Sequence, residues 1–519
     1  MNTNRIDSGQ IKTEQISQLS CSDFFDSEFL STKTGLIYDA ASQTQFSYSE
    51  LVELIQLQKQ SLLQALNTGV NAENSAQQAN SQKKSLIFLE ASNRLQVLVC
   101  YLAAIQLNQC VMLVDAQLSH DKKDHLKHIY QPELIAKFES ETWQISSKGC
   151  SSRKTQIHPD ICLLLTTSGS TGSPKLVKIS RANLLHNSQA ICQYLPIDPQ
   201  SSVVTSLPLF YSFGLSVINT HLAQGASIVL TDTNIMQKPF WALVKEHLPT
   251  GFYGVPYTFQ LMSQLGFHRL PLASINYYAQ AGGAMPSALS QNVLDYCLVQ
   301  QKQLFIMYGQ TEATARMAYL ELTKSTDKIG YIGKAIPNGE FKIINEAGNT
   351  VDKTNIEGEL CYRGANVGLG IAESPDDLKH IDMSDWLHTG DIALVDELGN
   401  YKITGRLKRF IKLSGKRVNL DEAQVYLQNL IQSESSQLIE MVLVGQDDKL
   451  QICHVTNNES QDILVSDEFL ISQLSNYLSC HPKFIQVYGI KAIPMTANNK
   501  IDYVKLTQLL MEKVENAQR

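Results

Sequence analysis

Apolar and polar positions follow two alternating periods along the first 330 residues of the chain. Leucines recur at helical spacing over residues 51–66, and short apolar runs at 85–90 and 110–114 enclose an apolar stretch at 94–107 that suits a buried helix. We expect further strands at 161–165, 203–206, 226–230, 251–255, 275–280 and 304–307. We expect further helices at 181–194, 215–223 and 241–247, and one more that ends near residue 301. Such alternation is typical of a parallel sheet covered by helices, which predicts a large α/β domain.

The pattern changes after residue 330. Residues 330–404 form short, glycine-rich segments, and the turns at Glu346–Asn349 and Glu397–Asn400 join probable strands of a small β region. A basic segment follows Gly405, then a helix at 420–431 and a terminal region that reads as a small α+β domain. We therefore expect an N-terminal domain over 1–407, with a β-rich subdomain at 330–404, and a C-terminal domain over 408–519.

Composition narrows the class of protein. The chain has 519 residues, of which 43% are hydrophobic and 18% charged, so it can bury more than one core. The net charge of -7 argues against a nucleic-acid partner. None of the ten cysteines forms a CxxC pair, which favours a reduced, cytoplasmic protein over a zinc or disulfide scaffold. The apolar stretch at 95–107 is shorter than the ~20 residues that span a bilayer, so we expect no membrane insertion.

A loop suited to phosphate follows the strand at 161–165. Residues 166–175 read TTSGSTGSPK, in which two glycines relax the backbone while hydroxyl groups and a lysine supply donors. The spacing differs from the Walker loop, GxxxxGK[ST]. A solvated turn is the alternative reading of this segment taken alone.

Five motifs in one order carry a resemblance to a known family. They are TTSGSTGSPK, YGQTEA at 308–313, HTGD at 388–391, GR at 405–406 with KLSGKRVNLDE after it, and NNKID around Lys500. Together they resemble the adenylate-forming (AMP-binding) superfamily, which includes acyl-CoA synthetases, peptide-synthetase adenylation domains and luciferases. The likeness covers roughly residues 46–505 and is greatest to acyl-CoA synthetase-like ligases.

The resemblance implies a reaction in two halves and a site for ATP and Mg²⁺. A carboxylate attacks the α-phosphorus of ATP to give acyl-AMP and pyrophosphate, and a thiol then takes the acyl group. In the first half Tyr308 would pack on adenine, Thr311 would contact the α-phosphate and Glu312 would hold Mg²⁺. Asp391 would accept hydrogen bonds from both ribose hydroxyls. The complete set of residues expected to bind ATP or AMP is Thr167, Ser168, Gly169, Ser170, Thr171, Gly172, Lys175, Gly283, Ala284, Tyr308, Gly309, Gln310, Thr311, Asp391 and Arg406.

Two lysines are assigned by the same resemblance. Lys500 would bridge the attacking carboxylate and the α-phosphate, which makes it catalytic together with Thr311 and Glu312; the family usually has Gly before this lysine, where this chain has Asn499. Lys408 would be the hinge about which the mobile C-terminal domain rotates between the half-reactions, although the family often has Asp there. The second orientation would bring the loop at Gly415 to the thiol tunnel.

The pocket for the acyl group is the least specified part of the sequence. By resemblance it involves Tyr211, Phe213, Tyr253, Gly254 and Gly282, an aromatic and mainly apolar lining, with core packing as the alternative for each aromatic ring. No acid lies in 203–220, which weakens an α-amino-acid substrate.

The resemblance thus implies an AMP-forming acid–thiol ligase with a carboxylic acid as substrate and CoA as the expected acceptor. The alternative is a free-standing adenylation enzyme that loads a carrier-protein phosphopantetheine. A luciferase-like oxygenase and a non-catalytic nucleotide-binding relative are less favoured, because nothing specifies oxygen chemistry and every catalytic position has a suitable occupant. The sequence leaves the particular acid and the oligomeric state open.

Overall fold

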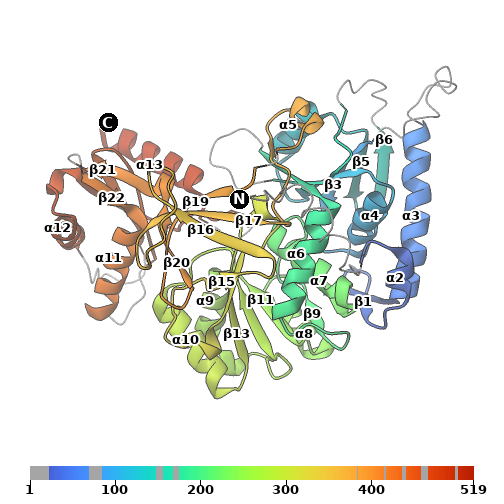
Figure 1. The fold of residues 1–519 in the computed structure, drawn as a ribbon, viewed down its shortest axis with the longest axis horizontal. Helices are drawn as coiled ribbons and strands as arrows, with labels where there is room; N and C mark the ends of the chain where they lie inside the picture. Colours follow the sequence, from blue (N-terminus) through green and yellow to red (C-terminus); the bar gives the residue numbers. More distant parts are fainter. Residues whose placement is uncertain are drawn as a thin grey trace, which may run out of the picture.

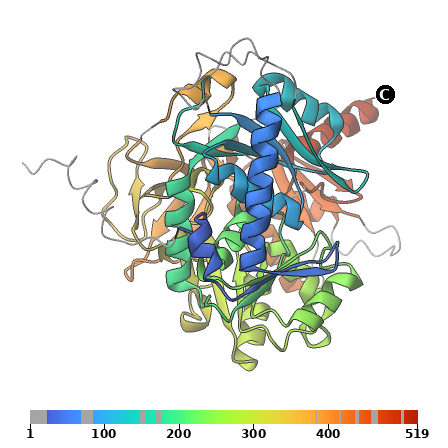
Figure 2. The ribbon, with the colours of Figure 1, turned by 90° about the vertical axis from the view of Figure 1, so that its right-hand side faces the viewer.

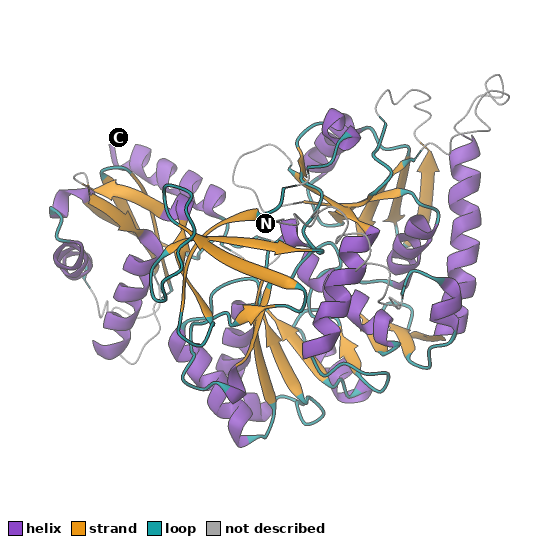
Figure 3. Ribbon diagram, viewed as in Figure 1, coloured by secondary structure: helices purple, strands orange, loops and turns teal. Residues whose placement is uncertain are grey.

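The structure, a computed structural model, describes residues 23–68, 84–147, 156–166, 175–382, 384–413, 416–434, 440–456, 466–496 and 501–518. It confirms the expected fold class, a large α/β N-terminal part with a small β region, followed by a smaller C-terminal part of strands and helices (Figure 3). The phosphate loop at 167–174 lies outside the described residues, as does most of the polar segment at 67–84.

A seven-stranded sheet forms the N-terminal layer, in the order β18-β8-β7-β4-β3-β5-β6. Its central strands are parallel, whereas β7 and β8 pair antiparallel. The strands are β3 (Leu86–Ala91), β4 (Cys110–Asp115), β5 (Leu134–Glu139), β6 (Thr142–Ser147), β7 (Ile161–Thr166), β8 (Leu176–Ser180) and β18 (Ile371–Ala372). Its helices are α3 (Tyr48–Thr68), α4 (Leu95–Gln106), α5 (His120–Tyr130) and α6 (Arg181–Tyr194).

Helix α4 is the buried helix that the apolar run at 94–107 predicts. Every residue from Leu95 to Ile105 except Gln96 is buried, because the helix packs on β3 and β4 on one side and on α3 on the other. Figure 2 shows α3 lying across the outside of this layer.

Two further sheets complete the α/β part. The first is five-stranded, with β11 (Gly251–Gly254), β12 (Tyr277–Gln280), β13 (Gln303–Tyr308), β14 (Ala318–Glu321) and β15 (Lys334–Ala335) in that order. The second has the order β2 (Thr44–Ser47), β1 (Leu36–Asp39), β10 (Ser227–Leu230), β9 (Ser202–Val204). Their helices are α2 (Ser27–Ser31), α7 (Ser212–Gln224), α8 (Lys238–His247), α9 (Pro256–Leu265) and α10 (Ser287–Val299).

The glycine-rich region folds as an antiparallel sheet, as its turns predict. The order is β16 (Gly339–Ile344), β17 (Gly358–Gly364), β19 (Leu387–Val395), β20 (Tyr401–Arg406). The turn at Glu397–Asn400 joins β19 to β20, and the Asp396 carboxylate accepts from the backbone of Asn400 at 2.8 Å. This sheet buries its own apolar cluster, which includes Phe341, Leu360 and Tyr362.

The C-terminal residues form a hairpin, a three-stranded sheet and three helices. The elements are β21 (Phe410–Leu413), β22 (Lys416–Asn419), α11 (Leu420–Glu434), β23 (Met441–Gln446), β24 (Lys449–Val455), α12 (Asp467–Leu478), β25 (Ile485–Ile490) and α13 (Tyr503–Gln518). Two apolar clusters in this region draw every buried member from residues 411–510. In Figure 1 these orange and red elements lie at the end of the molecule opposite α3. The domain boundary at 407/408 stays a prediction.

The sequence pattern overlooks several elements that the structure contains. Helix α5 is polar on most of its surface and buries only Lys123, Leu126 and Tyr130, so its periodicity is faint. Strands β1, β2, β5, β6 and β8 and helix α9 also lie where no element is expected from the pattern. All eight cysteines among the described residues are thiols, in line with a reduced protein.

Candidate functional site

The ends of three parallel strands bring the expected site segments together. Strands β11, β12 and β13 pair in parallel, with Gly254 opposite Gln280 and Gln280 opposite Ile306. The segment Ala281–Ala284 follows β12, and Gly309–Glu312 follows β13. Ligands of open α/β sheets bind at the carboxyl ends of the strands, so this edge is where the motifs should converge.

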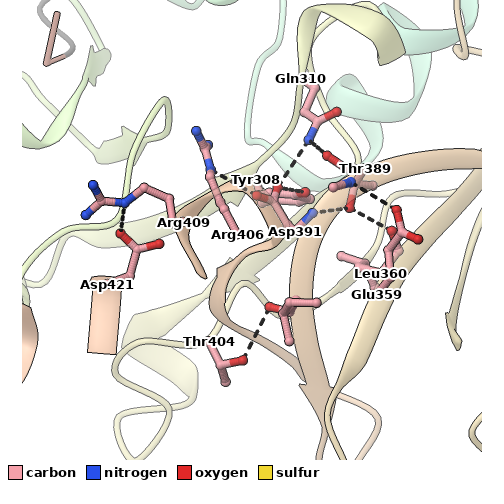
Figure 4. Close-up of polar contacts among 12 residues, drawn as sticks. Tyr308, Gln310, Glu359, Leu360, Thr389, Asp391, Thr404, Arg406, Arg409 and Asp421 are labelled. Atoms are coloured by element: carbon pink, nitrogen blue, oxygen red, sulfur yellow. Dashed lines mark hydrogen bonds and ion pairs between the residues drawn. The ribbon is translucent and has the colours of Figure 1, made fainter. Parts of the chain in front are cut away.

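Asp391 is the polar centre of the site. The residue is 2% exposed. Its Oδ2 accepts hydrogen bonds from the Tyr308 hydroxyl (2.5 Å) and the Gln310 amide (3.1 Å), and its Oδ1 forms an ion pair with Arg406 Nε (3.0 Å). Figure 4 shows the three donors converging on this carboxylate. Arg406 reaches it because the two residues are directly paired between β19 and β20. Burial, reinforced by the nearby carboxylate, holds the pKa of Tyr308 well above its usual value, so its hydroxyl keeps the proton that it donates.

The turn before Asp391 is held by its own hydrogen bonds. Thr389 Oγ1 donates to the Leu360 carbonyl at 2.6 Å and accepts from the Asp391 backbone at 3.1 Å. Gly390 has φ +69°, a left-handed angle that glycine adopts without strain. Glu359 of the neighbouring strand accepts from the Gly390 backbone at 3.3 Å, so a residue that the sequence reading did not single out supports the turn.

Glu359 also belongs to a group of potential metal ligands. His388 Nδ1 lies 3.1 Å from a Glu359 carboxylate oxygen and 3.8 Å from Cys361 Sγ. Burial raises the pKa of Cys361 to about 11, which keeps the thiol protonated in this setting. In this structure the contacts of Glu359, Cys361 and His388 are hydrogen bonds that support the turn.

Thr311 and Glu312 occupy a short 3₁₀ turn at the end of β13. Thr311 Oγ1 lies 3.3 Å from the hydroxyl of Ser212, the first residue of α7. The Glu312 backbone carbonyl accepts from Gly368, but its carboxylate makes no hydrogen bond or ion pair to any residue that the structure describes. A single half-buried carboxylate fits Mg²⁺, which usually takes one or two protein carboxylates and completes its shell with phosphates and water.

Several expected site residues fall outside this view. Thr167–Gly172, Gly415 and Lys500 lie outside the described residues. Lys175, at the far end of the phosphate loop, has its Nζ 2.5 Å from Glu373 Oε1 on the protein surface. Its role toward phosphate stays a prediction.

The segment around the expected hinge is anchored on both sides. Lys408 lies in a 3₁₀ turn, Leu407–Arg409, between β20 and β21. Arg409 donates to the Asp421 carboxylate and to the Leu443 carbonyl, both C-terminal to the expected hinge, at 2.8 and 2.7 Å. Arg406 and Arg409 thus each form an ion pair with an acid of this chain, Asp391 and Asp421 respectively.

The aromatic residues expected around the acyl group form one buried wall. Tyr211, Phe213 and Tyr253 are 7%, 1% and 2% exposed. Their rings meet edge to face, with centroids 6.2 Å apart from Tyr211 to Phe213 and 6.3 Å from Phe213 to Tyr253. Tyr253 places its hydroxyl 2.6 Å from that of Tyr277, so its polar end is satisfied inside the core.

A small cavity of about 20 Å³ lies against this wall. It is lined by Tyr211, Ser212, Phe213, Ala281, Gly282, Gly309, Gln310, Thr311, Ala315 and Arg316. Of the residues expected around the acyl group, Tyr211, Phe213 and Gly282 line this cavity, and Tyr253 and Gly254 are not among its lining residues. Gly282 has φ +87°, and a Cβ on Gly309 would lie 1.8 Å from the Ala315 carbonyl oxygen, so both glycines are needed for the backbone to close around the cavity.

The resemblance places the pocket lining in residues 208–214 and in the residues after Glu312, which contain Ser212, Ala315 and Arg316, but it does not single out these three. The available signal for Arg316 was that it is the one charged residue in the run 313–320. A second cavity, of about 260 Å³, lies between α6 and the loops at 336–338 and 365–366, and contains none of the expected site residues.

Solved structures share this fold. The O-succinylbenzoate coenzyme A synthetase MenE of Bacillus subtilis, solved with ATP and a magnesium ion, superposes with a TM-score of 0.72 at 19% identity, covering 94% of this chain and 99% of its own. The chain therefore has the fold of this synthetase.

Comparisons of the sequence find a matching family model and related acyl-CoA ligases. The family model described as AMP-binding enzyme matches residues 123–372. The mitochondrial medium-chain acyl-CoA ligase ACSF2 of Rattus norvegicus is 26% identical over 67% of this chain and 57% of its own length. The putative acyl-CoA synthetase YngI of Bacillus subtilis is 30% identical over 50% of this chain and 48% of its own. The chain spans about half the length of these curated relatives, and the match to the family model covers a little under half of this chain.

No helix within the described residues is long and apolar enough to cross a bilayer.

Proposed function

We propose that the protein adenylates a carboxylic acid with ATP and then transfers the acyl group to a thiol, that of CoA. The observation that carries the proposal is the convergence of Tyr308–Glu312, Ala281–Ala284 and Asp391 on one edge of the five-stranded sheet. The named acyl-CoA ligases among the relatives favour CoA over a carrier protein as acceptor. The thiols of this chain fit a reducing compartment such as the cytoplasm.

We assign the work of the first half-reaction to residues at this edge of the sheet. Asp391 receives a ribose hydroxyl, Tyr308 and the flat Gly282–Ala284 segment enclose the base, and Thr311 faces the α-phosphate. Glu312 would hold Mg²⁺, whose charge offsets the negative charge that develops on the phosphate oxygens. Lys500 would bridge carboxylate and phosphate, since a flexible ammonium can follow a charge that moves between them.

The second half-reaction requires the site to change. Pyrophosphate must leave and a thiol must enter, and motions of this kind set the rate of many enzymes. We propose that the C-terminal domain, residues 408–519, rotates about Lys408, withdraws Lys500 and brings the Gly415 loop to the thiol.

The proposal is tested by a screen for pyrophosphate release over diverse carboxylic acids. We expect at least one acid to stimulate release, and the same acid to form a thioester when CoA is added. Lys500→Ala should lose the release, while Lys505→Ala, which removes an exposed lysine of α13, should keep it. Acid-independent release, or thioester formation with a carrier protein and none with CoA, would reject the proposal or its acceptor respectively.

A further inference from the structure

Arg316 is a buried charge beside the proposed acyl site. It is 3% exposed and follows β13 in the loop that also carries Thr311 and Glu312. The two residues before it, Thr314 and Ala315, have φ of +61° and +141°. Residues other than glycine rarely adopt such backbone angles, and the strain persists only where the surrounding structure enforces it. The backbone here is therefore bent in the way that turns Arg316 into the interior.

The guanidinium has few partners there. It stacks over the Phe213 ring, with Cζ 3.9 Å from the ring centroid, and Nη1 donates to the Ala315 carbonyl at 3.2 Å. Its Nε is buried and makes no hydrogen bond, and no carboxylate among the described residues lies within ion-pair distance. A guanidinium offers five N–H donors in a fixed fork that matches an anionic group, and this one uses a single donor.

Two neighbouring tyrosines, Tyr194 and Tyr253, do not supply the missing anion. Burial holds the pKa of Tyr194 and of Tyr253 far above its usual value, so both hydroxyls stay neutral. A buried cation without an anion is costly, and such groups are paired or serve a ligand.

Arg316 lines the cavity of about 20 Å³ together with Gly282 and Thr311. One water needs roughly 10–15 Å³ of such space, so the cavity has room for about one water-sized group beside Arg316, and a bound carboxylate would widen it. Thr311 is the residue that faces the α-phosphate in the proposed reaction. The free end of a bound acid would thus reach Arg316 after a short spacer.

We propose that the acid substrate carries a second anionic group, and that Arg316 binds it at the far end of the acyl pocket. This inference rests on the proposed adenylation and names its substrate class: short-chain acids with a second carboxylate or a similarly small anion. An α-amino acid is disfavoured by the same charge, since its ammonium would enter a pocket whose only ionised side chain among the lining residues is a cation.

The test compares acids that differ only in the second charge. Succinate with butyrate, and glutarate with valerate, are matched pairs, and monomethyl succinate keeps the length while removing the charge. We expect kcat/KM for pyrophosphate release to favour one diacid over its monoacid by about 100-fold, the scale of a buried charge-assisted hydrogen-bonded pair. A sulfonate analogue, 3-sulfopropionate, shows whether the pocket reads any small anion or carboxylate alone.

Variants assign the preference to Arg316. Arg316→Met should reduce the diacid-to-monoacid ratio to within about threefold of unity, and Arg316→Lys should retain part of it, because lysine keeps the charge but loses the fork. Arg269→Met removes an exposed arginine and should leave the ratio unchanged. AMP binding, measured by calorimetry, shows whether each variant is folded. If neither Arg316 variant binds AMP, the diacid-to-monoacid ratio of kcat/KM in the wild-type protein tests the proposal by itself.

The outcomes separate the two proposals. Normal pyrophosphate release with monoacids, together with no preference for any diacid or sulfonate, would overturn the role of Arg316 and leave adenylation intact. A diacid preference that survives in Arg316→Met would overturn it as well. Absence of release with every acid would remove the proposed function, and the substrate class with it.

Discussion

Asp391 offers the sharpest test of the proposed nucleotide site, because its hydrogen-bonding capacity can be counted. An ionised carboxylate has about four lone-pair sites. Both sites of Oδ2 accept hydrogen bonds, from Tyr308 at 2.5 Å and from Gln310 at 3.1 Å, and the ion pair with Arg406 Nε at 3.0 Å occupies one side of Oδ1. One direct hydrogen bond from ribose can therefore be added without displacing a donor, where the sequence resemblance implies two.

Asp391→Asn is the perturbation of choice. It preserves the shape of the side chain but replaces one acceptor oxygen by an amide that meets donors. A hydrogen bond to a charged group contributes ~1.5–3 kcal/mol, so we expect AMP to bind about 10- to 150-fold more weakly. The free site also predicts asymmetry: of 2′-deoxy-AMP and 3′-deoxy-AMP, one should bind wild type about as well as AMP and the other about 10-fold or more weakly.

Isothermal titration calorimetry measures each of these affinities. 2′,3′-Dideoxy-AMP is the control ligand, because it should bind wild type and Asp391→Asn alike if the substitution acts through the ribose. AMP affinity that stays within threefold in Asp391→Asn would refute the assignment. Equal weakening of both monodeoxy nucleotides would show that a second hydroxyl displaces Arg406, whose side chain is 65% exposed and free to swing away.

Four further predictions follow from the site and its surroundings. Lys500→Ala should abolish carboxylate-dependent ATP–pyrophosphate exchange, and unchanged exchange would contradict its bridging role. Lys408→Pro should spare adenylation and impair thioester formation, so equal loss of both activities would argue against the hinge. Glu312→Gln should shift the Mg²⁺ titration of activity to higher concentration, whereas coincident titrations would exclude it as a ligand. Burial lowers the pKa of His221 from 6.5 to about 4, so the unfolded chain takes up a proton first as pH falls. The free energy of unfolding should then decrease between pH 6.5 and 4, by up to ~3 kcal/mol. His221→Leu should flatten that part of the melting profile, and an unaltered slope would assign it to other groups.

The sequence predicted the architecture well wherever apolar periodicity is strong. Helix α6 has the predicted bounds, Arg181–Tyr194, and α4 differs from prediction by a residue at each end. The pattern failed where burial is sparse or strands are short, as at α5 and β1. Those elements are held by their neighbours in the fold, β1 for example by parallel pairing with β10 nearly two hundred residues away.

The site was predictable as a set of motifs and not as a set of contacts. The HTGD motif does not by itself indicate that Arg406 pairs with Asp391, because that pairing depends on the register of β19 against β20. Glu359 was missed for the same reason: its carboxylate supports Gly390 across the sheet. Motif order reports which segments share a function, and strand register decides which side chains meet.

Asp391 and Arg316 show what the contacts add to the interpretation of a buried charge. Both side chains are nearly inaccessible, at 2% and 3% exposure, and both lie in segments rich in small or apolar residues. The charge of Asp391 is balanced within the chain by the Arg406 ion pair, and Tyr308 and Gln310 donate hydrogen bonds to it. Asp391 therefore holds the site together, and a ligand can use only the acceptor capacity that remains. Arg316 has a ring and one carbonyl as partners and no acid among the described residues. Since an isolated buried cation is costly, its missing partner is expected from outside the chain. Asp391 and Arg316 are almost equally buried, so it is the balance of charge around each that distinguishes their roles. Asp391 holds the pocket together, whereas Arg316 selects the acid that enters it.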